Sequence, residues 1–188
     1  MRKDLDNVEV QLVPVEEEHL PALRKIRMDP KIHGQFFAWR PISERDQAEW
    51  YEDFRDSMDR VGFTVMARRV TAVAPDDRLF RPIGFAQVTD IDHRHGTGQV
   101  GGFMVDPAWQ SKGIGRAMVD MIAGYCFMTI GLRKLWLMVY EDNERAIGIY
   151  KKAGFEVEGC LWKHAFRDGC FRDVLVMSLF RVRAESGC

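Results

Sequence analysis

The sequence predicts a single α+β domain, residues 1–188, built around a mostly antiparallel sheet. The chain of 188 residues is long enough for one domain with a substantial core. Several short runs alternate apolar and polar residues, as strands do, while other stretches space their apolar residues as helices do. Only residues 106–140 are expected to hold a loop and a long helix that lead into a strand, which is the order of a crossover to a parallel strand. The other strands are therefore expected to be antiparallel.

The first third of the chain predicts one strand and two helices. Apolar residues alternate with polar ones over residues 8–12, and helical spacing follows over residues 16–28. Ser43, with Asp46 three residues later, is typical of a capped helix start, and this helix is expected to run to about Arg60. Its apolar face is expected to hold Trp50, Tyr51, Phe54 and Met58.

The remaining two thirds predict strands interrupted by two helices. The strands are expected at residues 63–67, 83–88, 99–105, 134–140, 155–166 and 171–180. The helices are expected at 113–130 and 143–153, the second ended by Gly154. A polar loop at 74–78 is expected between the first two strands, and the Asp-Gly pair at 168–169 favours a hairpin turn between the last two.

The composition argues against several functional classes. The formal net charge is −1, so bulk electrostatics indicate neither a nucleic-acid partner nor a membrane surface. No apolar run approaches the ~18 residues that span a bilayer, and no signal peptide is recognisable, so a cytoplasmic location is expected. The four cysteines form no C-x-x-C pair and have no histidine at zinc-ligand spacing, so no metal is expected.

A glycine-containing loop before the predicted helix at 113–130 has the features of an anion site. A strand ends before it, and the helix start directs several backbone N–H groups and the positive end of the helix dipole to one place. Gly113 and Gly115 let an anionic group approach the backbone, and Lys112 and Arg116 add positive charge nearby. A diphosphate suits this arrangement best.

Two common diphosphate motifs do not fit this loop. A dinucleotide-binding fingerprint needs a third glycine where the chain has Met118, and it normally follows the first strand. A Walker A loop needs Gly-Lys-Ser/Thr, whereas Lys112 precedes its glycine. Taken alone, a G-x-G of this kind caps a turn more often than it binds an anion.

Two motifs, in this order, resemble the GNAT superfamily of N-acetyltransferases. Residues 110–115 have the form Q-x-x-G-x-G after a strand and Asp-Pro, which looks like the acetyl-CoA pyrophosphate loop of that superfamily. Residues 143–155 resemble its second signature, N-x-x-A-x-x-x-Y-x-x-x-G-F. The tail at 159–177 is similar to branches that contain spermidine, L-amino-acid and ribosomal-protein N-acetyltransferases.

The resemblance implies a fold, a donor and a set of binding residues. The fold is a mostly antiparallel sheet of six or seven strands with splayed middle strands and about four helices, and the cofactor-binding core spans about residues 97–155. The donor is acetyl-CoA, used without a metal. The implied cofactor-binding residues are Phe103, Met104, Val105, Gln110, Ser111, Lys112, Gly113, Ile114, Gly115, Arg116, Asn143 and Tyr150.

The resemblance also implies a mechanism in which an amine attacks the thioester directly. The pantetheine arm would pair with the backbone of residues 103–105, where an amide would stabilise the oxyanion. Residues 111–116 would hold the diphosphate, and Asn143 would contact the arm. Tyr150 would protonate the departing thiolate, which is reasonable for a phenol of pKa ~10 facing a thiolate of pKa ~8.5. On its position alone, Tyr150 also fits core packing.

The general base is left open by the sequence. Many members of the superfamily carry a glutamate seven residues before the proline of the loop, and this chain has Val100 there. Asp90, Asp92 and His93, at the end of the preceding strand, are the nearest titratable candidates. The same residues are also typical of a simple polar turn.

The acceptor is expected to be a small primary amine such as an amino acid, a polyamine or an amino sugar. Phe36, Phe37 and Trp39 could line its pocket, and Glu49, Asp53 and Asp56 could attract a cationic amine. Core aromatics and a solvated helix face explain the same two groups of residues. Spermidine acetyltransferases of this type carry paired glutamates in the connection before Pro41, where this chain has Arg40, and this weakens a polyamine assignment.

Two alternative functions stay open at this point. One is a protein N-terminal acetyltransferase, which needs an open groove for a peptide. The other is a CoA-binding sensor without activity, because a fold does not fix a function. The resemblance makes a homodimer possible. The sequence does not identify the acceptor, the acyl-chain preference or the oligomeric state.

Overall fold

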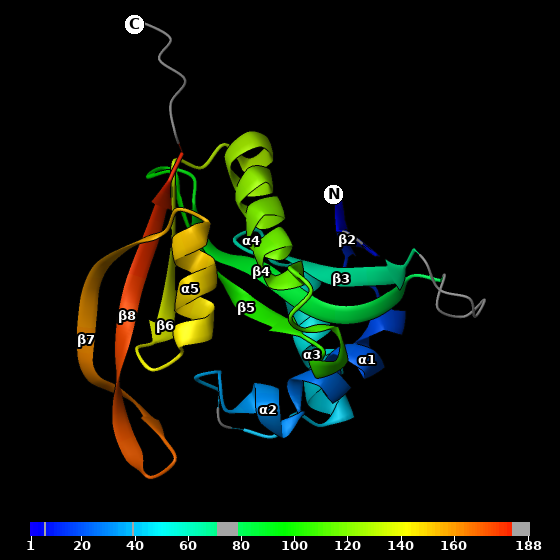
Figure 1. The fold of residues 1–188 in the computed structure, drawn as a ribbon, viewed down its shortest axis with the longest axis horizontal. Coiled ribbons are helices and arrows are strands. Elements are labelled where there is room, and N and C mark those ends of the chain that lie inside the picture. Colours follow the sequence, from blue (N-terminus) through cyan, green and yellow to red (C-terminus); the bar gives the residue numbers. More distant parts are fainter. Residues whose placement is uncertain (6, 39, 71–78, 182–188) are drawn as a thin grey trace, which may run out of the picture.

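The computed structural model describes residues 1–5, 7–38, 40–70 and 79–181, and their strands form one twisted sheet (Figure 1). The expected loop at 74–78 and Trp39 lie outside the described residues. The eight strands of this described sheet are β1 (Arg2–Leu5), β2 (Val8–Pro14), β3 (Val61–Arg69), β4 (Arg81–Asp92), β5 (Thr97–Val105), β6 (Lys134–Tyr140), β7 (Glu156–Arg167) and β8 (Cys170–Phe180).

The strand order β1-β2-β3-β4-β5-β6-β8-β7 is antiparallel except between β5 and β6. These two parallel strands pair only over Thr97–Gln99 and Lys134–Trp136, and both strands continue well beyond that pairing. The middle of the sheet therefore splays open, as predicted. The expected crossover supplies the parallel pair, and the α+β class is confirmed.

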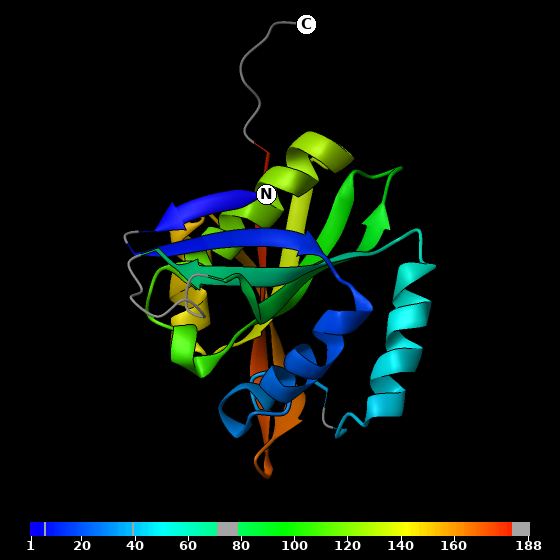
Figure 2. The ribbon, with the colours of Figure 1, turned by 90° about the vertical axis from the view of Figure 1, so that its right-hand side faces the viewer.

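Helices cover both faces of this sheet (Figure 2). In the described chain they are α1 (Leu20–Arg27), α2 (Pro30–His33), α3 (Glu44–Arg55), α4 (Ile114–Tyr125) and α5 (Glu144–Lys152). Helix α4 packs in one apolar cluster with β2 and β3, while α1 and α3 pack in a second cluster around Phe85 and Met104. Phe85 and its neighbour Ala86 belong to different clusters because successive strand residues point to opposite faces.

The sheet has more strands than the six or seven expected, because β1 gives no sequence signal. Its residues Arg2–Leu5 are mostly charged, and they join the sheet through backbone pairing with β2. A short helix, α2, is also added to the four expected. It begins at Pro30, after Asp29 caps the N–H of Lys31 at 2.8 Å.

The structure corrects the predicted ends of two helices and confirms the predicted end of a third. Helix α3 begins at the predicted Ser43 cap but ends at Arg55, so Met58 is 91% exposed rather than part of the apolar face. The helix expected at 113–130 is regular only to Tyr125 and continues as a π-helical turn, Cys126–Ile130. Gly154 ends α5 with a φ of 93°, as predicted.

The late hairpin forms as predicted. Asp168 and Gly169 both have positive φ, 49° and 77°, which is the conformation of the two-residue turn that suits twisted strands. In Figure 1 this hairpin, β7 with β8, extends beyond the end of β6 toward α2. In the part of the chain that the structure describes, no helix has the length and apolar character needed to cross a membrane.

Candidate active site

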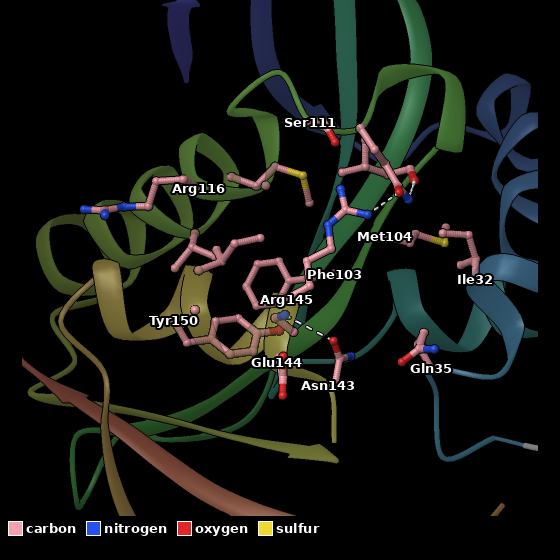
Figure 3. A pocket seen from close by; sticks show the side chains of 18 of the residues that line it. Ile32, Gln35, Phe103, Met104, Ser111, Arg116, Asn143, Glu144, Arg145 and Tyr150 are labelled. Carbon is pink, nitrogen blue, oxygen red and sulfur yellow. Dashed lines mark hydrogen bonds between the residues drawn. The ribbon is translucent and has the colours of Figure 1, made fainter. Parts of the chain in front are cut away.

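A cavity of about 1020 Å³ opens where β5 and β6 separate, between the start of α4 and helix α5 (Figure 3). Its volume is at the upper end of ordinary ligand pockets, which suits a large cofactor. Its walls come from five regions: α2 and the residues after it, the end of β5, the loop into α4 with the first turns of that helix, α5 with the β6–α5 loop, and Arg167 at the end of β7.

The loop into α4 is shaped by short-range capping. Asp106 accepts the N–H of Ala108 at 2.8 Å and starts a 3-10 turn, Pro107–Trp109, whose Trp109 is buried. Ser111 and Gly113 then adopt left-handed φ values of 62° and 76°. Gly113 is the N-cap of α4 and has no side chain to accept the first-turn N–H groups. These donors are therefore available to an anionic ligand.

Most of the predicted cofactor-binding residues meet at this cavity. Those that line it are Phe103, Met104, Val105, Gln110, Ser111, Gly113, Gly115, Arg116, Asn143 and Tyr150. Two predicted residues are not among the lining residues. Ile114 is buried in the core at 1% exposure, and Lys112 is exposed outside the cavity.

Strand β5 is bulged at the cavity. Two residues, Gly102 and Phe103, lie opposite the single Ala86 of β4, because the pairing shifts between Phe85 and Gln87. Gly102 has a φ of 64°, and a Cβ there would lie 3.0 Å from the Phe85 ring. A bulge leaves backbone groups unpaired and bends the strand, so the backbone near Phe103 can receive an extended ligand. Gly102 was not selected from the sequence, because the Gly101-Gly102 pair belongs to neither of the two motifs.

A hydrogen-bond chain crosses the cavity. Gln110 donates from Nε2 to the carbonyl of Val105 at 2.9 Å, and its Oε1 accepts from Arg145 Nη1. Figure 3 shows the Arg145 side chain reaching from α5 toward the loop. Arg145 lies inside the second motif, at one of its unspecified positions, so the motif gave no reason to select it.

Asn143 is tied to the start of α5. Its Oδ1 accepts the N–H of Ala146 at 3.1 Å, which makes Asn143 the N-cap of the helix. The side chain lies at the cavity wall, so capping and a ligand contact are compatible.

Tyr150 lies at the centre of the site. Its ring packs between those of Phe103 and Phe155, each with its centroid 5.9 Å away. Burial raises the pKa of the phenol above its ordinary value, since burial disfavours the phenolate. Tyr150 lines this cavity and also a second one, so its predicted core packing and its predicted chemistry are compatible.

The second cavity, of about 230 Å³, lies over β4 and β5 beside the same gap. It shares several lining residues with the first cavity, among them Phe36, Phe103 and Tyr150. Its polar lining residues are Gln35, Gln87, Thr89, Gln99, Asn143 and Tyr150. No lining residue in the described chain carries a formal charge at neutral pH.

The sequence-derived base candidates lie away from both cavities. Asp90, Asp92 and His93 are absent from the described lining residues. Asp92 instead accepts the N–H of His95 at 2.9 Å within the β4–β5 turn, so the interpretation as a polar turn fits it. Val100, at the position of the usual glutamate, is buried at 2% exposure.

The acceptor candidates separate into two groups. Phe36 lines both cavities, and Phe37 lines the second while its ring packs 4.8 Å from that of Tyr140. The acidic residues of α3 line neither cavity. Glu49 pairs with Arg45 and Asp53 with Arg60, so this helix face is a solvated, charge-paired surface.

One acidic cluster was not expected from the sequence. Glu141, Cys160 and Asp173 place one ligand atom each within 4.8 Å of one another. Asp173 already accepts the N–H of Lys163 at 2.6 Å, and exposed acidic groups commonly lie this close. The absence of a metal from the reaction therefore stays a prediction.

Comparison with known proteins identifies the family. The model of the acetyltransferase (GNAT) family matches residues 20–155. Spermidine N(1)-acetyltransferase of Escherichia coli (strain K12) is 26% identical over 172 residues, covering 92% of this chain and 86% of the relative. L-amino acid N-acetyltransferase AaaT of the same organism is 35% identical over 77 residues, covering 41% of this chain and 48% of the relative.

A solved structure has the same fold. The crystal structure of spermidine N-acetyltransferase from Vibrio cholerae in complex with CoA and spermine superposes with a TM-score of 0.80 at 22% identity, covering 91% of this chain and 95% of the other. The family match over residues 20–155 confirms the resemblance seen in the two motifs, with acetyl-CoA as the donor that this family uses. The cavity, the two motifs and the family match agree: this chain belongs to the acetyltransferase (GNAT) family.

Proposed function

We propose that this chain transfers the acetyl group of acetyl-CoA to a small primary amine at the junction of the two cavities. One observation carries the proposal. The large cavity joins the uncapped start of α4 to the gap between β5 and β6, and Tyr150 lies where it meets the second cavity. The first cavity would hold the cofactor, and the second would admit the amine.

The cofactor would bind mainly through backbone groups. Its diphosphate fits the N–H groups at the start of α4, with Arg116 nearby to add charge. The pantetheine arm fits beside the bulged end of β5, where unpaired backbone groups at Phe103 to Val105 can pair with it as an added strand does. The thioester then lies near Tyr150. Arg145 is proposed to move from Gln110 to the diphosphate.

These residues, together with water, account for every bond and proton of the transfer. The amine nitrogen attacks the thioester carbon, an N–C bond forms, and a backbone N–H of β5 stabilises the oxyanion. The C–S bond then breaks, and the thiolate takes the Tyr150 proton. The raised pKa of Tyr150 keeps the phenol protonated throughout neutral pH. The attacking nitrogen loses its proton to water, and water returns a proton to Tyr150.

A homodimer remains a proposal. It is supported by apolar side chains that stand exposed on the β7–β8 hairpin, including Trp162 at 83%, Phe166 at 64% and Phe171 at 64%. Exposed apolar patches of this kind often mark an interface. Light scattering of the purified chain measures the mass directly, and a monomer at micromolar concentration would contradict the proposal.

A thiol-release assay tests the proposed function. The purified chain is mixed with acetyl-CoA and with an amino acid, a polyamine, an amino sugar or a peptide with a free N-terminus. We expect release of CoA that depends on one of the small amines. Preference for the peptide would favour the protein N-terminal acetyltransferase. Tight binding of acetyl-CoA without amine-dependent release would favour the sensor.

A further inference from the structure

Arg167, near the tip of the β7–β8 hairpin, is held inside the wall of the large cavity. Its side chain is 15% exposed, and its Nη2 pairs with Asp142 in the β6–α5 loop. The guanidinium lies over the Tyr140 ring, with its carbon 4.3 Å from the ring centroid. The Tyr140 ring also contacts the ring of Phe37, which lines the second cavity. Arg167 thus lies in the wall of the large cavity, and the rings of Tyr140 and Phe37 connect it to the second cavity.

Part of this guanidinium lacks a hydrogen-bond acceptor. In the described chain, Nε and Nη1 of Arg167 are shielded from water and have no hydrogen-bond partner. Nε lies 3.6 Å from an Asp168 carboxylate oxygen, beyond a good hydrogen bond. Buried donors are nearly always satisfied, because an unpaired one loses its bond to water without replacement. Since these donors are shielded, a carboxylate in the cavity reaches them only after a shift of the guanidinium, whose planar set of donors then suits that ligand.

The charge of the whole site favours an acceptor that is not a polycation. The charged residues lining the large cavity in the described chain are Lys31, Arg116, Asp142, Glu144, Arg145, Lys152 and Arg167, so cations outnumber carboxylates. The second cavity offers only neutral polar groups. The phosphates of the cofactor would neutralise the cations near the start of α4, whereas Arg167 comes from the β7–β8 hairpin. The second or third ammonium group of a polyamine would therefore lie near few carboxylates.

We propose that the acceptor is a small primary amine that also carries a carboxylate, of the α-amino acid class, and that Arg167 binds this carboxylate. The proposal rests on the proposed function, since it names the acceptor of the same site. Asp142 and Tyr140 act as positioning residues that hold the guanidinium. The apolar or neutral side chain of the acceptor lies against Phe36 and Phe37 in the second cavity.

Matched substrates test the proposal in the wild-type protein. Thiol release is measured with leucine, with leucinamide, with isopentylamine, which lacks the carboxylate altogether, and with spermidine. We expect kcat/KM for leucine, or for the best of a panel of free amino acids tested in the same way, to exceed that for its matched amide and amine by about 10- to 100-fold. Equal or better use of the matched amine or of spermidine overturns the proposal.

Variants connect the preference to Arg167. Arg167→Gln is expected to lose most of the amino-acid activity, while kcat/KM for the matched amine and the Kd for acetyl-CoA change less than about twofold. Arg167→Lys, which keeps the charge, is expected to recover part of the amino-acid activity. Arg45→Gln is the control, because Arg45 is an exposed arginine paired with Glu49 that lines neither cavity. Thermal unfolding of each variant identifies any loss that comes from misfolding.

The outcomes separate this proposal from the proposed function. If the wild-type protein releases no thiol with any amine, the proposed function fails and this proposal fails with it. If it acetylates amines but Arg167→Gln lowers kcat/KM equally for every substrate, the proposed acetyltransferase activity is supported and the proposed carboxylate site is wrong. Retention of the full amino-acid preference in a folded Arg167→Gln protein leads to the same conclusion.

Discussion

The two halves of the site are built differently. The proposed cofactor half consists of one continuous stretch, from the end of β5 through the loop into α4, together with α5, and much of it would act through backbone groups. The proposed acceptor half gathers side chains from the segment at α2, the β6–α5 loop and the β7–β8 hairpin, which are far apart in the sequence. Local backbone geometry leaves a motif in a sequence, whereas a pocket assembled from distant side chains does not.

Tyr150 joins the two halves, so its substitution is expected to have the largest effect. Tyr150→Phe removes the proposed proton donor and is expected to lower kcat by ~10–1000-fold, because general acid catalysis contributes about this much. The ring contacts with Phe103 and Phe155 remain, so the melting temperature should change little. Steady-state kinetics and thermal unfolding check both statements. Wild-type turnover in this variant would remove Tyr150 from the mechanism.

Gly113 tests the cofactor half alone. Its φ of 76° strains a residue with a Cβ, and relief of that strain would move the N–H groups of the proposed diphosphate site, although the Cβ itself would lie 3.8 Å from Leu5, an ordinary contact. We expect Gly113→Ala to raise the Kd of acetyl-CoA by about tenfold and to cost about 1 kcal/mol of stability. Calorimetric titration and denaturant unfolding measure the two effects.

A matched glycine provides the control for that experiment. Gly131 has a similar φ of 84°, ends the π-helical turn after α4, and lines neither cavity. Gly131→Ala should therefore cost similar stability and leave the Kd of acetyl-CoA unchanged. Equal loss of affinity in both variants would show that backbone strain, rather than the diphosphate site, causes the effect.

Arg145 is expected to have a smaller effect within the same half. Arg145→Ala removes the bond to Gln110 and one cation of the cavity, and we expect the KM for acetyl-CoA to rise about 3- to 10-fold with kcat nearly unchanged. Lys151→Ala, on the same helix but outside the lining residues, is the matched control. A fall in kcat without a change in KM would place Arg145 in the acceptor half instead.

The pH dependence gives the mildest test. Burial raises the pKa of Tyr150, so the group holds its proton more tightly in the folded protein than in the unfolded chain. Its contribution to stability and its role as an acid are fully present below about pH 10, the unfolded pKa, and are lost only as pH rises through the higher folded value. The kcat measured with saturating amine should therefore show no Tyr150-dependent fall below pH ~10. A fall near neutral pH that is absent in Tyr150→Phe would contradict this.

The sequence predicted the strands and helices that carry periodic or turn signals, including the Ser43 cap, β6 and the 168–169 turn. It missed β1, whose residues join through backbone pairing and have no apolar pattern. In the site it selected Gly113, Gly115 and Tyr150, which stand at fixed motif positions. It missed Arg145 and Arg167, because their roles depend on partners from other segments, Gln110 and Asp142.

Calorimetric titration of acetyl-CoA into the wild-type, Gly113→Ala and Arg167→Gln proteins tests the division of the site most directly. We expect Gly113→Ala to weaken binding about tenfold, and Arg167→Gln to bind acetyl-CoA as the wild-type protein does. If Arg167→Gln loses acetyl-CoA affinity as Gly113→Ala does, then both residues serve the cofactor and the proposed separation of cofactor and acceptor halves is wrong.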